Sequence, residues 1–197
     1  MQIKQISIAL IATVSTITSF AQDRKDLTVS VGVGKMSSPY YLNADAGEFF
    51  SIDLGYQLSK RQTLSANYNA GRHNYYDNVL SNISEPFKES TTNSKVSYNT
   101  FSIIYKYKVL DKKIFSVNIG AGAGLKTETR QYPYTEGNSS NFRETSITGD
   151  IVFPVVLEFD FKLSEHFKLG LAGGFFVEPD YPIVNFYAGP RFSYVIK

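Results

Sequence analysis

The chain of 197 residues contains no cysteine. This excludes disulfides, thiolate metal sites, cysteine nucleophiles and a lipid-modified cysteine at a mature N-terminus. Tryptophan is absent too, and histidine occurs only at His73 and His166. We expect neither a bound metal nor a cofactor, and the length suits a single domain.

Excess charge of one sign is also lacking. The 20 basic and 18 acidic residues give a net charge of +2. A surface that binds nucleic-acid phosphates needs clustered excess basic charge. We therefore expect no nucleic-acid partner.

Long hydrophobic runs are missing beyond the N-terminal region, so the sequence predicts no transmembrane helix. The N-terminal region has one charge, Lys4, followed by the apolar run 6–14 and by Ser19-Phe20-Ala21. Small residues at Ser19 and Ala21 match a signal-peptide cleavage site. The alternative, an uncleaved anchor helix, needs about 20 apolar residues. We expect residues 1–21 to be a cleaved signal peptide and residues 22–197 to be the mature chain, with 19 basic and 18 acidic residues.

Aromatic residues, in contrast, are abundant: they make up 15% of a chain whose mean hydropathy is slightly negative. A membrane barrel explains the mixture, because the polar half of each strand dilutes its apolar half. The stretch 182–197 shows this pattern most clearly. Every second residue from Val184 to Ile196 is apolar, whereas the set between them is small or polar and carries Arg191. The stretch is longer than the roughly 9–11 residues that a tilted strand needs to cross a bilayer.

Eight stretches alternate with period two, which predicts eight strands. They cover residues 26–34, 48–58, 63–72, 95–109, 114–125, 147–163, 167–177 and 182–197. The connections between them alternate in length. The longer ones are residues 35–47, 73–94 and 126–145 and the moderate 178–182, and the tight turns are 59–62, 110–113 and 164–166. In an up-and-down meander, all tight turns then lie on one rim with both termini, and the longer loops lie on the other. This asymmetry is typical of outer-membrane barrels.

The two faces of the strands differ in a way that indicates which one is outside. The polar face is dominated by Gly, Ser, Asn and Thr, whereas a surface in water would carry many long charged side chains. Small side chains fit the narrow interior of an eight-stranded barrel. Aromatic residues also gather toward the strand ends, as interfacial girdles do. We predict an all-β, eight-stranded antiparallel up-and-down transmembrane β-barrel. The alternative is a soluble lipocalin-like barrel with its apolar face inside.

The chain resembles the small outer-membrane β-barrel family, the OmpA-like and OmpX-like eight-stranded barrels of Gram-negative bacteria. The resemblance covers essentially the whole mature chain and rests on the strand count, the loop asymmetry and the alternating stretch 192–196. Family members often end in an aromatic residue, whereas this chain ends in Ile196-Lys197. The resemblance implies a monomer in the outer membrane, without an added peptidoglycan-binding domain. It also implies contact with outer-membrane lipid and lipopolysaccharide, and the barrel-assembly machinery as a partner during biogenesis.

Four charged residues fall on the inward face at similar heights. Asp53, Glu158 and Arg191 each lie five residues from the tight-turn end of their strands, and Lys106 lies slightly lower. Because an unpaired buried charge is costly, we predict that these four side chains form an internal ion-pair network. Such a network either plugs the lumen or acts as a gate or proton path.

The glycine-rich run 120–126 invites comparison with nucleotide-binding loops. Its spacing is G-x-G-x-G, and Leu125 separates Gly124 from Lys126, so neither dinucleotide-binding nor P-loop spacing is present. We expect the inward glycines to make room for larger lumen side chains such as Tyr187 and Arg191.

The two histidines are predicted on opposite rims and cannot share a site. His73, with Asp77 nearby, is compatible with a lipid-modifying barrel enzyme that activates a serine or water. However, the sequence shows neither the His-x-Ser-Asn pattern of lipid A deacylases nor the N-terminal amphipathic helix of the palmitoyl transferase.

Tyrosines recur in the three longer predicted loops among Ser, Asn and Gly, a composition that suits protein recognition. They are Tyr40, Tyr41, Tyr75, Tyr76, Tyr132 and Tyr134. The alternative is a solvated loop with tyrosines resting on lipopolysaccharide or on the barrel rim. The sequence thus favours a barrel without enzymatic activity that has a plugged lumen and a structural role or contacts an extracellular protein. A narrow channel for a small solute is the first alternative, and a lipid-modifying enzyme is the second.

Overall fold

The computed structural model describes residues 26–39, 46–76, 93–136, 139–179 and 185–197. The predicted signal peptide and the loop tyrosines Tyr40 and Tyr41 lie outside these ranges. The described residues form eight strands: β1 (Leu27–Ser37), β2 (Gly47–Gln57), β3 (Gln62–Tyr76), β4 (Asn93–Asp111), β5 (Phe115–Glu136), β6 (Ser139–Lys162), β7 (Phe167–Val177) and β8 (Asn185–Ile196).

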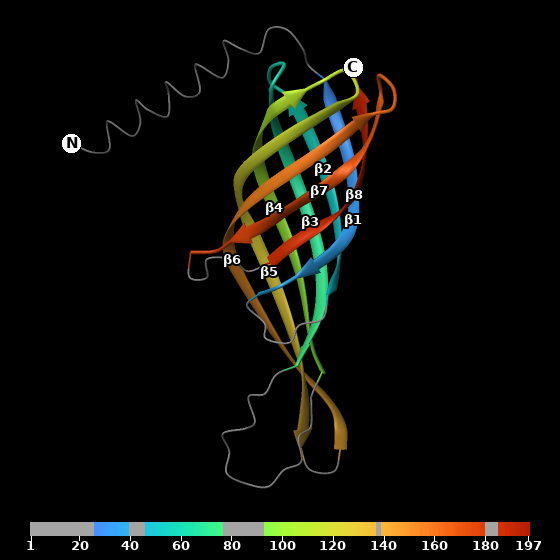
Figure 1. Cartoon of the computed structure of the whole chain (residues 1–197). Helices are drawn as coiled ribbons and strands as arrows, with labels where there is room; N and C mark the ends of the chain where they lie inside the picture. Colours follow the sequence, from blue (N-terminus) through green and yellow to red (C-terminus); the bar gives the residue numbers. More distant parts are fainter. Residues whose placement is uncertain (1–25, 40–45, 77–92, 137–138, 180–184) are drawn as a thin grey trace, which may run out of the picture.

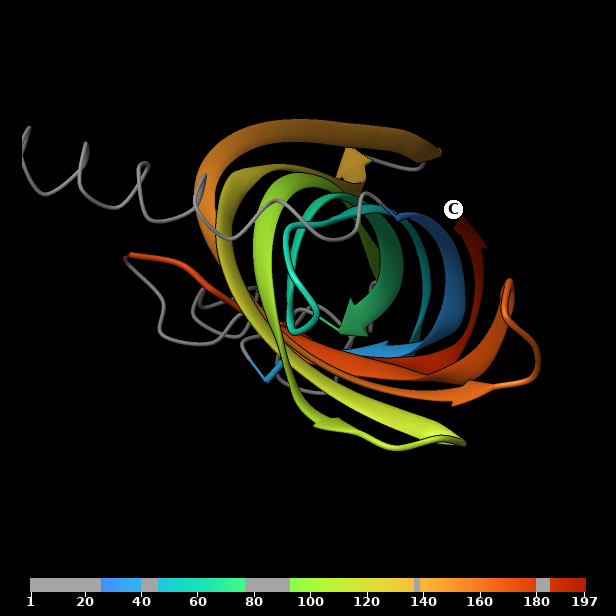
Figure 2. The ribbon, with the colours of Figure 1, turned by 90° about the horizontal axis from the view of Figure 1, so that it is seen from above.

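Each strand pairs antiparallel with the next, and β8 pairs with β1 to close the barrel (Figures 1 and 2). At the seam, Leu27 lies opposite Ile196 and Val31 lies opposite Phe192. Closure pairs the backbone groups of the two edges, which an open sheet in a bilayer would leave unsatisfied. The turns 58–61, 112–114 and 163–166 share one end of the barrel with the C-terminus (Figure 1). The predicted meander is therefore confirmed.

No helix within the described part of the chain is long and apolar enough to cross a membrane.

Successive residues along a strand alternate between the outer surface and the interior. Ser102 is 1% exposed, whereas its neighbours Phe101 and Ile103 are 57% and 46% exposed. The same alternation runs along β8, where Arg191, Ser193 and Val195 are buried and the residues between them are exposed. The apolar face is therefore the outer one, as the sequence predicts.

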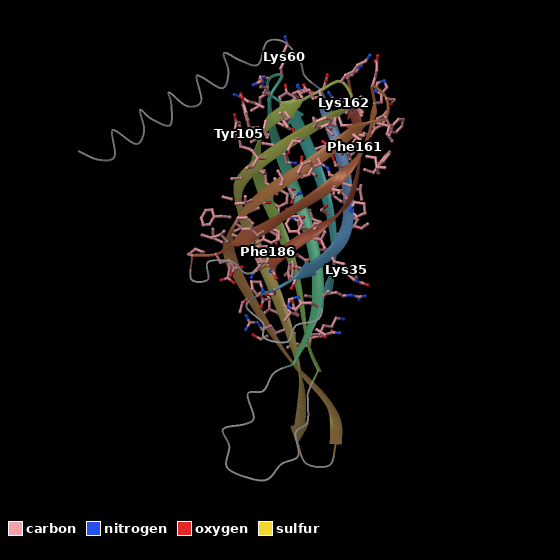
Figure 3. The ribbon with its side chains drawn as sticks, viewed as in Figure 1. Lys35, Lys60, Tyr105, Phe161, Lys162 and Phe186 are labelled. Atoms are coloured by element: carbon pink, nitrogen blue, oxygen red, sulfur yellow. The ribbon has the colours of Figure 1, made fainter. Side chains whose placement is uncertain are left out.

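Lysines lie near both ends of the barrel. Figure 3 shows Lys60 and Lys162 at the tight-turn end and Lys35 toward the opposite end. The exposed aromatic residues Phe161 and Phe186 lie at heights between them. Long basic side chains at such positions keep their charge in water while their stems cover apolar surface.

The prediction of a loop over residues 126–145 is wrong. β5 continues to Glu136 and β6 begins at Ser139, so the two strands form a hairpin that, among the described residues, extends farthest from the tight-turn end of the barrel (Figure 1). The alternation stops at Leu125 because beyond the apolar surface both faces of a strand can be polar. Hydrophobic periodicity then gives no signal, although hydrogen bonding between the strands persists.

For the same reason, other strands extend beyond their predicted ends, and this changes the predicted location of the tyrosines. β1 runs to Ser37, β3 to Tyr76, and β4 starts at Asn93. Four of the tyrosines predicted in loops therefore belong to strands: Tyr75 and Tyr76 to β3, and Tyr132 and Tyr134 to β5.

Candidate functional site

The interior of the barrel contains a ring of four charges that comes from alternate strands. Its members are Asp53 on β2, Lys106 on β4, Glu158 on β6 and Arg191 on β8. The strand order of the barrel is sequential, so these side chains approach the axis from four sides and their charges alternate in sign around it. We call this set the charge ring.

Each member of the charge ring contacts both of its neighbours. Lys106 Nζ lies 2.9 Å from Asp53 Oδ1 and 2.6 Å from Glu158 Oε1. Arg191 pairs with Glu158 through Nη1, and its Nη2 lies 3.8 Å from Asp53 Oδ1. The structure therefore brings together all four residues that the sequence singled out. The ring is electrically neutral.

All four side chains are buried, with exposed fractions of 4–7%. Odd-numbered strands supply polar groups that support the ring. Asn67 on β3 donates to Asp53 Oδ2 at 3.3 Å, and Asn118 on β5 donates to Glu158 Oε2 at 3.4 Å. Arg191 Nη2 donates to Ser30 Oγ on β1 at 2.8 Å. Pairing and hydrogen bonding of this kind are what buried charges require.

Glycines flank the bulky ring members on adjacent strands. Gly32 and Gly170 lie opposite Arg191 on its two sides. A Cβ at Gly170 would approach Phe159 O to 2.0 Å and Asp160 Oδ1 to 3.0 Å, so only glycine fits there.

The glycine-rich run of β5 has different neighbours from those expected. Gly120 lies opposite Lys106, and a Cβ there would come within 2.9 Å of Lys106 Cγ. Tyr187 lies opposite Gly174 on β7, not beside this run. The prediction that the run makes room for Tyr187 and Arg191 is wrong, because the groups nearest to a Cβ at Gly120, Gly122 or Gly124 all belong to β4.

An apolar layer fills the interior on the loop side of the charge ring. Tyr187 stacks on Phe49 with ring centroids 4.4 Å apart, and its ring lies 5.4 Å from that of Phe176. The buried members of this layer are Met36, Phe49, Val96, Tyr98, Ile104, Val152, Val156, Phe176 and Tyr187. Sequence reasoning treated the inward face as small and polar and so missed the layer, although Phe49, Tyr98 and Phe176 share the inward parity.

A second group of paired charges lies farther toward the loops. Lys126 on β5 pairs with Glu128 at 3.0 Å and with Glu178, and Glu128 also pairs with Arg130 at 2.5 Å. Lys126 and Glu128 are each 3% exposed. Sequence reasoning missed this cluster because it ended the strand at Leu125. Extending the even-numbered, inward face of the strand from Gly120 past Leu125 to Arg130 would have predicted the cluster.

The two histidines lie at opposite ends of the barrel. His73 on β3 is 3% exposed, and its ring lies 6.4 Å from that of Tyr98. His166 in the β6–β7 turn contacts Val195 O through Nδ1 at 2.9 Å. In the same turn, Glu165 accepts a hydrogen bond of 2.5 Å from Lys197 Nζ, which lowers the pKa of the Glu165 carboxyl.

The fold and the sequence together decide the family. The model of the outer membrane protein beta-barrel domain family matches residues 6–173. The chain belongs to this family. It is an outer-membrane protein of the Gram-negative type, so the tight turns lie on the periplasmic side and the loops and the β5–β6 hairpin face outward.

Solved structures of small outer-membrane barrels share the fold. Ail of Yersinia pestis, solved with the heparin analogue sucrose octasulfate, is 11% identical with a TM-score of 0.56, covering 88% of this chain and 100% of Ail. OprG of Pseudomonas aeruginosa is 11% identical with a TM-score of 0.56, covering 89% and 98%. A major outer membrane protein of Thermus thermophilus is 11% identical with a TM-score of 0.57, covering 88% and 100%. No curated protein matches the sequence significantly.

The charge ring generates a stability prediction. Replacing Lys106→Met leaves Arg191 as the only cation of the charge ring, facing its two buried carboxylates, Asp53 and Glu158. We expect a loss of about 3–5 kcal/mol in the free energy of unfolding, as for other broken buried pairs. Urea unfolding of the protein in lipid vesicles measures it.

The matched control removes a cation from an exposed pair. Arg72 Nη2 lies 2.8 Å from Glu48 Oε2, with side chains 59% and 65% exposed. Arg72→Gln should therefore change stability by no more than about 1 kcal/mol. Equal effects of the two substitutions would contradict the assignment of the ring as a buried, mutually dependent unit.

Proposed function

We propose that this outer-membrane barrel has no enzymatic activity and a lumen plugged by side chains. In this proposal, it supports the membrane structurally and presents the β5–β6 hairpin for contact with an extracellular partner. The observation that carries the proposal is that the charge ring and the apolar layer fill the interior at successive heights along the barrel axis.

The space left beside the charge ring is small. A cavity of about 20 Å³ lies there, bordered by Ser30, Asn67 and Tyr187 as well as by the ring itself. This is room for about one water molecule. An ion that crosses the barrel would have to break the paired ring and also displace the stacked Phe49 and Tyr187 rings, which favours a plug over a channel.

The outer part of the hairpin supports the contact role. Among the described residues, β7 pairs with β6 only over Phe153–Lys162, so the edge of β6 over residues 139–152 has no strand beside it on that side. Residues 145–150 are all exposed. An exposed strand edge is a template for pairing with an extended segment of another protein.

Conductance tests the plug. We expect the wild-type protein in a planar lipid bilayer to give no steady current. Arg191→Ala should also give none, because the apolar layer still fills the lumen on the loop side of the ring. Steady unitary steps from the wild-type protein would contradict the plug and favour the channel for a small solute.

Shortening the hairpin tests the contact role separately. Replacing residues 132–144 by Asn-Gly should form a tight turn between Gln131 and Thr145, which lie opposite each other. The barrel should still fold, as measured by heat-modifiable gel mobility, because the removed residues lie outside the closed ring of strands. A strain that lacks the gene should regain envelope integrity, measured as detergent resistance, with either the wild-type or the shortened protein.

Cell adhesion should distinguish the wild-type protein from the shortened one. Cells with the wild-type protein should bind better than cells with the shortened one to immobilised extracellular-matrix proteins or to heparin, which is included because Ail was solved with a heparin analogue. Equal adhesion of the two strains at equal surface levels would contradict a contact role of residues 132–144 of the hairpin.

A further inference from the structure

A groove lies on the outer wall of β1 to β4, near the loop-side end of the apolar surface. It consists of a hollow of about 720 Å³ and an adjoining hollow of about 330 Å³. Lys35, Glu48 and Arg72 line both hollows and so connect them. We call this feature the outer groove.

The strand register arranges the lining of the outer groove in two rows. Val33, Phe50 and Ala70 lie opposite one another on β1, β2 and β3 and form an apolar row. Two residues farther toward the loops, Lys35, Glu48 and Arg72 form a charged row in the same way. The boundary between hydrocarbon and headgroups should therefore fall between these rows.

The small side chain of Ala70 explains why the wall is hollow at this place. Phe50 is its cross-strand neighbour on one side, and Asn99 lies opposite it on the other. Asn99 Oδ1 accepts a hydrogen bond of 2.7 Å from Tyr68 Oη, which fixes the far border. The groove thus has an apolar floor between larger side chains.

On the loop side of this apolar floor, the groove carries more positive than negative charge. Arg72 donates from Nε at 3.1 Å and from Nη2 at 2.8 Å to Glu48 Oε2, and Lys35 and Lys95 add two further cations. Among the described residues that line the groove, three cations thus face one carboxylate. The outward residues that directly follow the apolar surface on β5 and β6 are uncharged: Thr127, Thr129, Gln131, Thr145, Ile147 and Gly149.

We propose that the outer groove binds a phosphorylated, acylated glycolipid of the outer leaflet. An acyl chain packs on Val33, Phe50 and Ala70, and a phosphate group contacts Lys35 and Arg72. The apolar row selects a lipid over a free anion, and the charged row selects a phosphorylated headgroup. Glu48 holds the Arg72 guanidinium in place. The proposal rests on the location in the outer membrane and not on the plug or on the hairpin.

The test uses the protein purified from outer membranes in detergent, with bound lipid counted by native mass spectrometry. The probes are diphosphorylated lipid A, its dephosphorylated counterpart and inorganic phosphate. The wild-type protein should bind the diphosphorylated lipid more tightly than the dephosphorylated one. The double variant Lys35→Gln/Arg72→Gln should bind it about thirtyfold more weakly, the factor expected from two surface cations.

Two further variants separate this site from general attraction. Lys60→Gln/Arg61→Gln removes the same charge from the opposite rim and should leave binding unchanged. Ala70→Phe fills the apolar floor with all charges intact and should weaken lipid binding as well. Heat-modifiable gel mobility checks that each variant is folded.

Three results would overturn the proposal. They are equal binding of the lipid with and without phosphates, an equal loss in the two double variants, and displacement of the lipid by millimolar inorganic phosphate, which would indicate a site for the free ion.

Discussion

An eight-stranded barrel in a membrane must close completely, and closure leaves an interior only wide enough for side chains. The remaining features of this protein follow from that constraint. Every second residue must face lipid, which makes the outer surface apolar. The others must fill a narrow space in which any polar group needs a partner. The charge ring meets this requirement because charges of alternating sign on alternate strands each find two opposite charges.

The closing strand β8 contributes to both closure and filling. Its outward residues complete the apolar surface, and its edge pairs with β1. Its inward Arg191 bridges Glu158 and Asp53, and Tyr187, two inward positions away, stacks on Phe49. Glycines occupy the positions opposite Arg191 on both neighbouring strands. A change on this strand therefore affects the wall and the interior together.

The sequence predicted the barrel and the charge ring because both depend on parity and on height along a strand. Asp53, Glu158 and Arg191 could be matched by counting from the tight turns, where strand ends are sharp. Features that depend on register between strands could not be predicted in this way. The pairing of Gly174 with Tyr187 is one example, and the outer groove above Ala70 is another. The hairpin of β5 and β6 was missed for a different reason, because strands beyond the membrane lose the alternation that reveals them.

The central claim, that inward side chains fill the lumen, can be tested directly because the chain contains no cysteine. Ser102 faces the interior and is 1% exposed. In lipid vesicles open to reagent on both sides, Ser102→Cys should resist a water-soluble maleimide until the protein is denatured. Lys60→Cys in the exposed β2–β3 turn should react at once. Labelling of folded Ser102→Cys at the rate of Lys60→Cys would show a water-filled lumen and contradict the account.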